Sequence, residues 1–209
     1  MISFKCKHCE KRFDVPDAYA GRQAKCKGCG NTLTVPVPSQ TTGQRPQSSV
    51  DLKMSPRARR LLADAESITQ IFGNCPHIRI VKQSGSPPDG YEIEYSVKSL
   101  ARDSKGKPIE RMDHRVLIQL TSDYPRLSPK CSMLTPAFHP NIDESTICVG
   151  DHWTAGERLT DLIVRIAEML GYQAYNIRSP LDGEAAMWAD LNQKKLPLDP
   201  RNMRPSTME

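Results

Sequence analysis

A stretch with helical periodicity stands out in the pattern of apolar and polar positions after residue 54. Its apolar residues recur at the three- and four-residue spacing of one helical face: Leu61, Leu62, Ala65, Ile68, Ile71 and Phe72. Ser55 is a good N-cap, Pro56 suits the first helical position, and Gly73 favours an end. The pattern therefore predicts an amphipathic helix that starts at residue 56 and stops at the glycine.

Shorter apolar runs with partial alternation follow this helix and predict strands. They are rich in β-branched side chains and lie at residues 78–81, 91–97, 115–120 and 130–134. Glycine and proline in segments 87–90 and 104–108 supply turn residues between the runs.

The remainder of the chain divides into helices, a linker and a tail. One helix is expected to be capped by Thr160 and ended by Gly171, and another is expected at residues 184–191. Residues 39–53 are rich in Pro, Ser, Thr and Gln, which predicts a flexible linker. Residues 194–209 hold little to bury, so we expect an extended C-terminal tail.

Residues 1–38 carry two Cys-x2-Cys pairs separated by 16 residues, Cys6 with Cys9 and Cys26 with Cys29. This spacing predicts a tetrahedral thiolate site for one structural Zn2+, in a small zinc ribbon that the metal stabilises. Gly28 and Gly30 are expected to permit tight turns with positive φ. Four cysteine ligands leave no open position for catalysis, and a rubredoxin-like iron site is the alternative.

Composition narrows the partners and the compartment. The formal net charge is +5, and the excess lies before residue 54. A thiolate-bound metal lowers the charge of the ribbon to about +2, which is too little to predict a nucleic-acid partner. Seven cysteines, an odd number, argue against a disulfide framework. No run has the length of a membrane span or a signal peptide, so we expect a cytoplasmic protein without a membrane partner.

The chemistry of interest is concentrated between residues 138 and 148. Asn141 provides an amide donor, and Cys148 provides a thiol seven residues later. Acyl transfer through a thioester requires a sulfur nucleophile and a fixed donor for the oxyanion. Cys75 and Cys131 have no such neighbour in sequence, and we interpret them as small apolar residues.

An ordered series of motifs extends this pattern on both sides: Tyr124-Pro125, His139-Pro140-Asn141, Cys148, Trp153 and Asn176-Ile177-Arg178-Ser179-Pro180-Leu181. The series resembles the ubiquitin-conjugating enzymes over roughly residues 55–192. The resemblance implies an α+β ubiquitin-conjugating fold in residues 54–193. That fold has an N-terminal helix, a four-stranded antiparallel meander and C-terminal helices.

The resemblance also implies roles for individual residues. Cys148 matches the acceptor that holds the modifier as a thioester. Asn141 matches the residue that supports the active-site loop and helps to stabilise the oxyanion, and His139 matches a buried residue that fixes the turn. Ser179 lies where the family has an acidic residue facing the incoming amine, and Asp182 nearby could replace it.

The chain departs from the family pattern at several points. The gap from Asn141 to Cys148 is one residue short, and Ser145-Thr146 stands where a glycine turn is common. His152 has no counterpart in the family, so that proton transfer and simple exposure to solvent are both open for it. These departures favour a divergent, bacterial-type conjugating enzyme.

The partners follow from the resemblance as well. An ATP-dependent activating enzyme would load a ubiquitin-like modifier onto Cys148, and a target amine would receive it. Arg57, Arg59 and Arg60 on the first helix are placed to contact that activating enzyme. The ribbon could recruit a ligase or a target protein.

Two alternatives remain open at this point. The first is a non-catalytic scaffold with the conjugating fold that binds partners through the ribbon. The second is a Cys–His hydrolase that pairs Cys148 with His139, His152 or His114, although no protease signature accompanies the cysteine.

Overall fold

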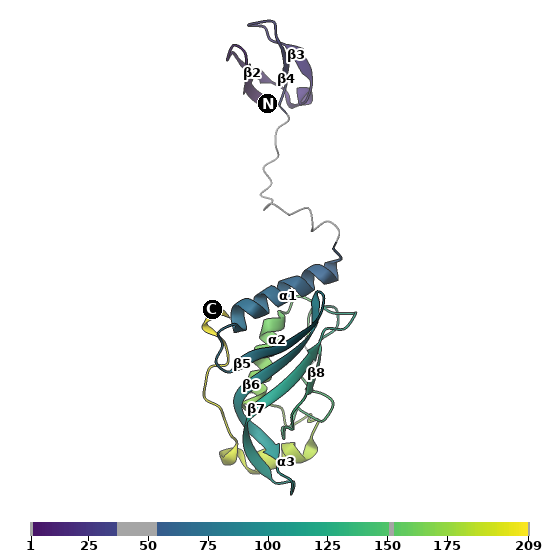
Figure 1. Ribbon diagram of the computed structural model, residues 1–209, viewed down its shortest axis with the longest axis vertical. Coiled ribbons are helices and arrows are strands. Elements are labelled where there is room, and N and C mark those ends of the chain that lie inside the picture. The colour runs from purple at the N-terminus through teal and green to yellow at the C-terminus, as the bar shows by residue number, and fades with distance from the viewer. Residues whose placement is uncertain (1, 37–53, 151–152, 209) are drawn as a thin grey trace. The chain divides into compact units, whose positions relative to one another are not determined.

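The computed structural model describes residues 2–36, 54–150 and 153–208 (Figure 1). The chain divides into two compact units, Met1–Asp51 and Leu52–Glu209. The linker predicted at residues 39–53 lies outside the described residues.

The N-terminal unit consists of two short antiparallel hairpins. Strand β1 (Ile2–Lys5) pairs with β2 (Arg12–Val15), and β3 (Gln23–Lys25) pairs with β4 (Thr32–Thr34). A single 3-10 turn, η1 (Asp17–Tyr19), lies between the hairpins. The described part of the N-terminal unit buries few apolar residues, namely Ile2, Cys6, Cys26 and Val35. Such a small core cannot stabilise a unit of this length without a further crosslink.

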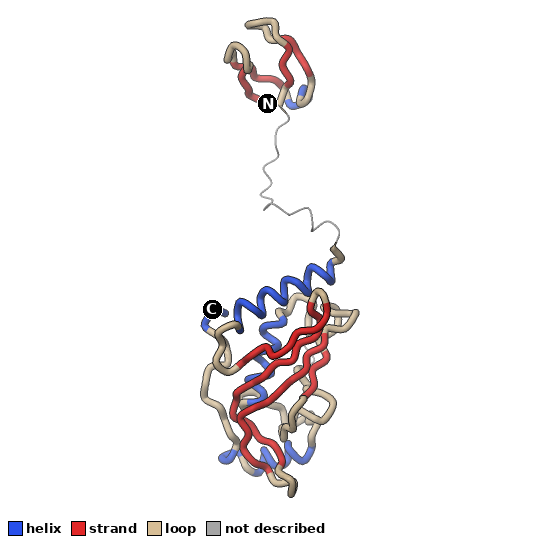
Figure 2. Tube along the Cα trace, in the orientation of Figure 1, coloured by secondary structure: helices blue, strands red, loops and turns tan. Residues whose placement is uncertain are grey.

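A four-stranded antiparallel sheet forms the larger unit, in the order β5-β6-β7-β8 (Figure 2). The strands are β5 (Ile78–Gly85), β6 (Pro88–Arg102), β7 (Pro108–Gln119) and β8 (Lys130–Met133). Strands β5, β6 and β7 are longer than the sequence predicted. Ion pairs at 3.1 Å join charged residues beyond the predicted runs, where Lys82 of β5 pairs with Glu92 and Lys98 of β6 pairs with Glu110 of β7.

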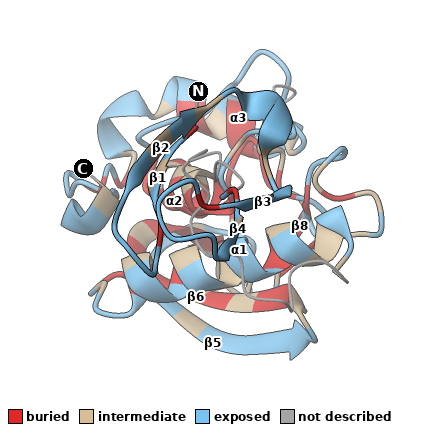
Figure 3. Cartoon of the chain, turned by 90° about the horizontal axis from the view of Figure 1, so that it is seen from above, coloured by how far each residue is buried: buried red, intermediate tan, exposed pale blue. Residues whose placement is uncertain are grey.

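Helix α2 (Leu159–Leu170) packs on the sheet, and most of its residues are buried. Helix α1 (Pro56–Phe72) packs on α2 and on β5 and β6, whereas α3 (Gly183–Leu191) follows near the opposite end of the unit (Figure 1). Figure 3 shows β6 largely buried and β5 mostly exposed. The four-stranded α+β fold predicted from the sequence is confirmed.

Local details of the helices test the predicted caps. The Ser55 hydroxyl accepts the Ala58 N–H at 3.1 Å and α1 begins at Pro56, as predicted. The predicted cap at Thr160 is wrong, because the N-cap of α2 is Arg158, two residues earlier, and Thr160 is buried within the first turn. The apolar surroundings of α2 override the capping preference of the hydroxyl.

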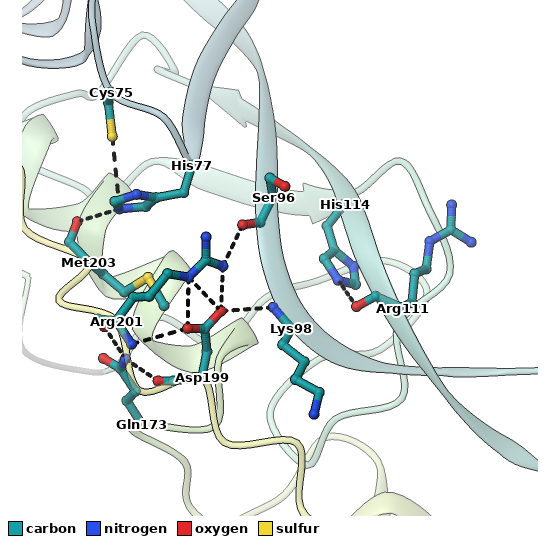
Figure 4. A network of polar contacts seen from close by, with 10 residues as sticks. All are labelled: Cys75, His77, Ser96, Lys98, Arg111, His114, Gln173, Asp199, Arg201 and Met203. Carbon is teal, nitrogen blue, oxygen red and sulfur yellow. Dashed lines mark hydrogen bonds and ion pairs between the residues drawn. The ribbon is translucent and has the colours of Figure 1, made fainter.

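The C-terminal segment is fixed on the domain, where the sequence predicted an extended tail with little to bury (Figure 4). The Asp199 carboxylate accepts the Lys98 backbone N–H at 3.0 Å and pairs with Arg201. Arg201 Nη2 also donates to the Ser96 carbonyl at 2.8 Å. Met203 is 1% exposed and its carbonyl lies 3.3 Å from His77 Nε2. Three isolated residues, Asp199, Arg201 and Met203, fix the segment, and no periodic pattern reveals them.

Candidate functional site

Four cysteines of the N-terminal unit form a candidate metal centre. The Sγ atoms of Cys6, Cys9, Cys26 and Cys29 all lie within 4.8 Å of one another. Cys6 Sγ lies 3.8 Å from Cys29 Sγ, and Cys9 Sγ lies 3.6 Å from Cys26 Sγ. A tetrahedron with zinc–sulfur bonds of about 2.3 Å has edges of about 3.8 Å. The four thiols therefore fit one metal ion.

The two knuckles have the same backbone arrangement. Glu10 N–H donates to the Cys6 carbonyl and Gly30 N–H donates to the Cys26 carbonyl, both at 2.9 Å. Gly30 has the predicted positive φ of 74°, whereas Glu10 takes the equivalent position at 56° without being glycine. Gly28 does not adopt positive φ, contrary to the sequence prediction. An added Cβ at Gly28 would lie 3.2 Å from Cys9 Sγ and 3.6 Å from Cys26 Sγ, so glycine leaves room for the thiol cluster.

The Gly28 backbone also acts on the cluster electronically. Its N–H donates to Cys26 Sγ at 3.3 Å. This bond, together with weaker contributions from the neighbouring thiols, lowers the pKa of Cys26 to about 6. A thiol that ionises near neutral pH is suited to metal binding, since the thiolate is the ligand.

In the larger unit, His139 is fully buried at the turn that precedes Asn141. Its Nδ1 accepts the Asn141 backbone N–H at 3.1 Å, and its ring packs against Tyr172 with centroids 4.8 Å apart. Burial lowers the pKa of His139 to about 3, so the ring stays neutral near pH 7. With Nδ1 occupied and the ring enclosed, His139 is suited to fixing the turn and unsuited to proton abstraction.

The Asn141 side chain joins this turn to the segment after α2. Its Nδ2 donates to the Asn176 carbonyl at 2.8 Å, and its Oδ1 accepts the Asn176 N–H at 2.7 Å. The Pro140 carbonyl accepts the N–H groups of Leu181 and Asp182 at 2.8 and 3.1 Å. Four hydrogen bonds therefore hold the two loops together. One N–H of the Asn141 amide remains for another acceptor.

The shortened turn between Asn141 and Cys148 is closed by Asp143. Its Oδ1 accepts the backbone N–H groups of Ser145 and Thr146, each at 2.7 Å, and the Ser145 hydroxyl at 2.9 Å. The hydrogen bond from the Ser145 N–H is the largest cause that lowers the pKa of Asp143. A carboxylate thus organises the turn in which the family commonly has glycine. Asp143 was not among the predicted site residues, although aspartate is a common turn residue whose side chain accepts the backbone N–H two residues later.

Cys148 follows this turn at the edge of the sheet. Its backbone N–H donates to the Asn141 carbonyl at 2.9 Å, and the Ile147 N–H donates to the Cys131 carbonyl at 2.9 Å. Ile147 is buried, whereas Cys148 is half-buried. The thiol-bearing residue lines a cavity of about 510 Å³ together with the start of β8 and the turn. The backbone therefore fixes a partly accessible cysteine beside a cavity.

The two residues proposed to face an incoming amine have different environments. Ser179 is exposed on the loop that Asn141 holds. Asp182 is the N-cap of α3, where its Oδ1 accepts the N–H groups of Glu184 and Ala185 at 2.9 Å. Arg102 Nη2 lies 3.8 Å from the other carboxylate oxygen. Asp182 therefore caps α3 and pairs with Arg102, and its role at the site stays a prediction.

The three arginines of α1 are also placed differently from one another. Arg57 donates to the carbonyls of Leu120 and Thr121 at 2.8 to 3.2 Å, and Arg59 is exposed. Arg60 Nε donates to Asp64 at 2.8 Å, and its other nitrogens donate to the carbonyls of Ala155 and Glu157 and to the Tyr124 hydroxyl. Two of the three arginines therefore bind groups of their own domain, and only Arg59 is exposed, so contact of the three with a partner stays a prediction.

The remaining candidate residues, His114, Cys131 and Cys75, have environments that suit structural roles. His114 is buried in β7, and its Nε2 lies 3.1 Å from the Arg111 carbonyl. Burial raises the pKa of the Cys131 thiol to about 12, and Cys75 Sγ lies 3.8 Å from His77 Nε2. His152 lies outside the described residues. Among the described helices, none is both long and apolar enough to cross a membrane.

Part of the larger unit is similar in sequence to known proteins. Residues 94–197 match the family model described as ubiquitin-conjugating enzyme. The probable ubiquitin-conjugating enzyme E2 31 of Arabidopsis thaliana is 32% identical over 80 residues, which are 36% of this chain and 52% of that protein. The chain thus spans about half the length of this curated relative.

Solved structures agree at the level of the fold. A novel ubiquitin-conjugating enzyme aligns with a TM-score of 0.51 and 20% identity, over 72% of this chain and 94% of its own. S. cerevisiae Ubc12 aligns with a TM-score of 0.53 and 19% identity, over 68% of this chain and 75% of its own. With the helix, antiparallel sheet and helices described above, these structures show that the larger unit has the ubiquitin-conjugating fold, and residues 94–197 are similar in sequence to the ubiquitin-conjugating enzyme family.

Proposed function

We propose that this protein accepts a ubiquitin-like modifier as a thioester on Cys148 and transfers it to an amine of a target. A separate activating enzyme would supply the modifier after spending ATP. The protein would then act as an acyltransferase, and it would need no nucleotide of its own.

The observation that carries the proposal is the support of Cys148 by the Asn141 turn. The Asn141 carbonyl accepts the Cys148 N–H, while its side chain makes two hydrogen bonds to the Asn176 backbone. A single residue thus couples the thiol to the loop that carries Ser179. Preorganised groups of this kind favour acyl transfer, because they need not reorganise as the oxyanion forms.

Roles for the other residues follow from their environments. The free N–H of the Asn141 amide would donate to the oxyanion, and neutral His139 would hold the turn. Ser179, which is exposed on the loop, would face the incoming amine. A general base is not essential for loading, because a cysteine is partly ionised near neutral pH.

The N-terminal unit would bind one Zn2+ through its four cysteines and serve as a recruitment module for a ligase or a target. The distances support a tetrahedral metal, and thiolate ligands favour zinc over harder ions. Exposed Arg59 on α1 would contribute to binding the activating enzyme. The scaffold alternative is not favoured, because it gives Cys148 and its support no function.

A charging assay tests the proposal. The full chain, ATP, an activating enzyme and its ubiquitin-like protein would be mixed, and adducts would be separated without reducing agent. We expect a thiol-labile adduct in the wild type and a thiol-resistant ester in Cys148→Ser. Cys131→Ser is the matched control and should charge normally, since that thiol is buried. A thiol-labile adduct that persists in Cys148→Ala would contradict the assignment.

A further inference from the structure

A second cavity of the larger unit shares no lining residue with the cavity beside Cys148. It has a volume of about 600 Å³ and is lined by the end of β8 and the segment after it, the turn after Asn141 and the start of α3. This volume lies within the range of ligand pockets in proteins, about 300–1,000 Å³. We call it the acidic cleft, after the carboxylates of Asp143, Glu144 and Asp182 that line it.

Apolar side chains make up half of the lining of the acidic cleft. Two of them, Leu134 and Leu181, are 48% and 41% exposed, although leucine is usually buried. An apolar side chain that covered them would remove this surface from water, which is favourable. The exposure of both leucines also shows that the cleft is open to solvent, so that it can receive a side chain from the surface of another protein.

The charged groups of the cleft favour a cation. Three carboxylates and one guanidinium line it, so its formal charge is −2. The guanidinium, that of Arg102, is already paired, since Nη1 lies 2.8 Å from Glu184 Oε1 and Nη2 lies 3.8 Å from Asp182 Oδ2. Glu144, in contrast, is exposed and makes no hydrogen bond or ion pair within the part of the chain that the structure describes. It can therefore pair with a cation from outside.

Backbone hydrogen bonds hold the walls of the cleft in place. The Pro140 carbonyl accepts the Leu181 N–H at 2.8 Å, which ties the start of α3 to the Asn141 turn. The Leu134 N–H donates to the Arg115 carbonyl at 2.7 Å, which ties the segment after β8 to β7. Because the two leucines are positioned before anything binds, little ordering is needed on association, and this lowers its cost.

We propose that the acidic cleft is a docking site for a protein segment that presents a large apolar side chain beside a lysine or arginine. The apolar side chain would lie against Leu134 and Leu181, and the cation would face Asp143 and Glu144. Nucleic acids and anionic membrane surfaces do not fit, because their charge has the same sign as that of the cleft. The inference is independent of the proposed function, since docking requires no acyl group on Cys148.

Titration of the full chain with short synthetic peptides tests this inference. The probes are fluorescein-labelled Gly-Ser-X-Lys-Arg-Ser-Gly, in which X is leucine, phenylalanine or methionine. Fluorescence anisotropy measures the Kd, and amide chemical shifts locate the site. We expect a Kd below about 1 mM for at least one probe, with shifts concentrated at residues 133–137, 142–144 and 181–183. Serine at X, or Glu-Glu in place of Lys-Arg, should each weaken binding at least about tenfold.

Matched variants at exposed positions identify the cleft. Leu134→Ser and Glu144→Gln should each weaken binding at least about threefold, whereas Leu127→Ser and Glu66→Gln, which lie outside the cleft, should leave it unchanged. The inference is overturned if Leu134→Ser binds as tightly as the wild type, if the acidic peptide binds equally well, or if no probe binds at about 1 mM. Cys148→Ala should bind the probes normally, so failure of the charging assay and failure of docking are seen separately.

Discussion

Asn141 shows how much one side chain can contribute to this site. Both polar atoms of its amide bind the Asn176 backbone, and its own carbonyl binds the Cys148 N–H. Asn141→Ala leaves two backbone groups of Asn176 without partners. We expect the free energy of unfolding to fall by about 1–3 kcal/mol, as for other lost buried hydrogen bonds. Chemical denaturation measures this change.

The same variant also tests the chemical role of Asn141. Once charged, Asn141→Ala should discharge to free lysine about 100-fold more slowly than the wild type, in line with the loss of one oxyanion donor. Ser179→Ala is the matched control for stability, because Ser179 is exposed on the loop that Asn141 holds. Its free energy of unfolding should change by no more than about 0.5 kcal/mol. Equal discharge rates for Asn141→Ala and the wild type would remove Asn141 from the mechanism.

The candidate site could be predicted from sequence where residue identity determines the chemistry. Cys148 and Asn141 carry groups that acyl transfer uses, and the ordered series of motifs around them singled them out as candidates. Asp143 and Asp182 could not be assigned in this way. Their carboxylates accept backbone N–H groups that the fold brings to them, so their roles depend on local geometry.

At the scale of elements, α1 was predictable because both of its ends carry local signals. Strands β6 and β7 were predicted too short, because both continue through charged residues such as Lys98 and Glu110, which pair with each other across the two strands. The C-terminal segment was harder to predict. Its fixation depends on Asp199 and Met203, whose partners lie about a hundred residues or more earlier in the chain.

Two arginines of α1, Arg60 and Arg59, should differ in how much they contribute to stability. Arg60 pairs with Asp64, and both bond to the Tyr124 hydroxyl in a partly buried cluster. Arg60→Ala should lower the free energy of unfolding by about 2–4 kcal/mol, because Asp64 keeps a buried charge without its partner. Arg59→Ala should change it by no more than about 0.5 kcal/mol.

The two variants should also differ in how they affect charging. Arg59→Ala should slow loading by the activating enzyme while leaving discharge to free lysine unchanged, if α1 contacts that enzyme. Loading and discharge rates of Arg59→Ala, measured at a temperature below its unfolding transition, test this expectation. Normal loading of Arg59→Ala at limiting activating enzyme would exclude the exposed arginine from the contact.

The C-terminal segment predicts a dependence of stability on pH. The Arg201 guanidinium is the main cause that holds the pKa of Asp199 well below its usual range. A lowered pKa in the folded state contributes stability that is present above the unfolded-state value of about 3.9 and is lost as the pH falls toward the folded-state value. Between pH 5 and 2, wild-type stability should therefore fall more steeply than that of Asp199→Asn. Denaturation at several pH values, with hydrogen exchange in residues 197–205, measures the difference.

At the scale of the whole molecule, the two units should respond independently to loss of metal. The N-terminal unit buries few apolar side chains, whereas the larger unit has an extensive apolar core around α2 and the sheet. In so small a unit the site forms only when the chain folds, so the free energy of metal binding contributes directly to the free energy of folding. Removal of the metal with a strong chelator should therefore unfold residues 2–36 and leave the larger unit folded.

Hydrogen exchange resolved by segment is the direct measurement of this prediction. Amides of β1–β4 should lose protection after chelation, while those of β6 and β7 should keep it. Metal analysis should find one zinc per chain and no iron, and Cys9→Ser should lose the metal.

Because Cys148 belongs to the other unit, Cys9→Ser and a chain lacking residues 1–53 should both still charge. If they charge but no longer modify a target that the full chain modifies, the ribbon recruits that target. Equal modification of the target by all three proteins would exclude this role.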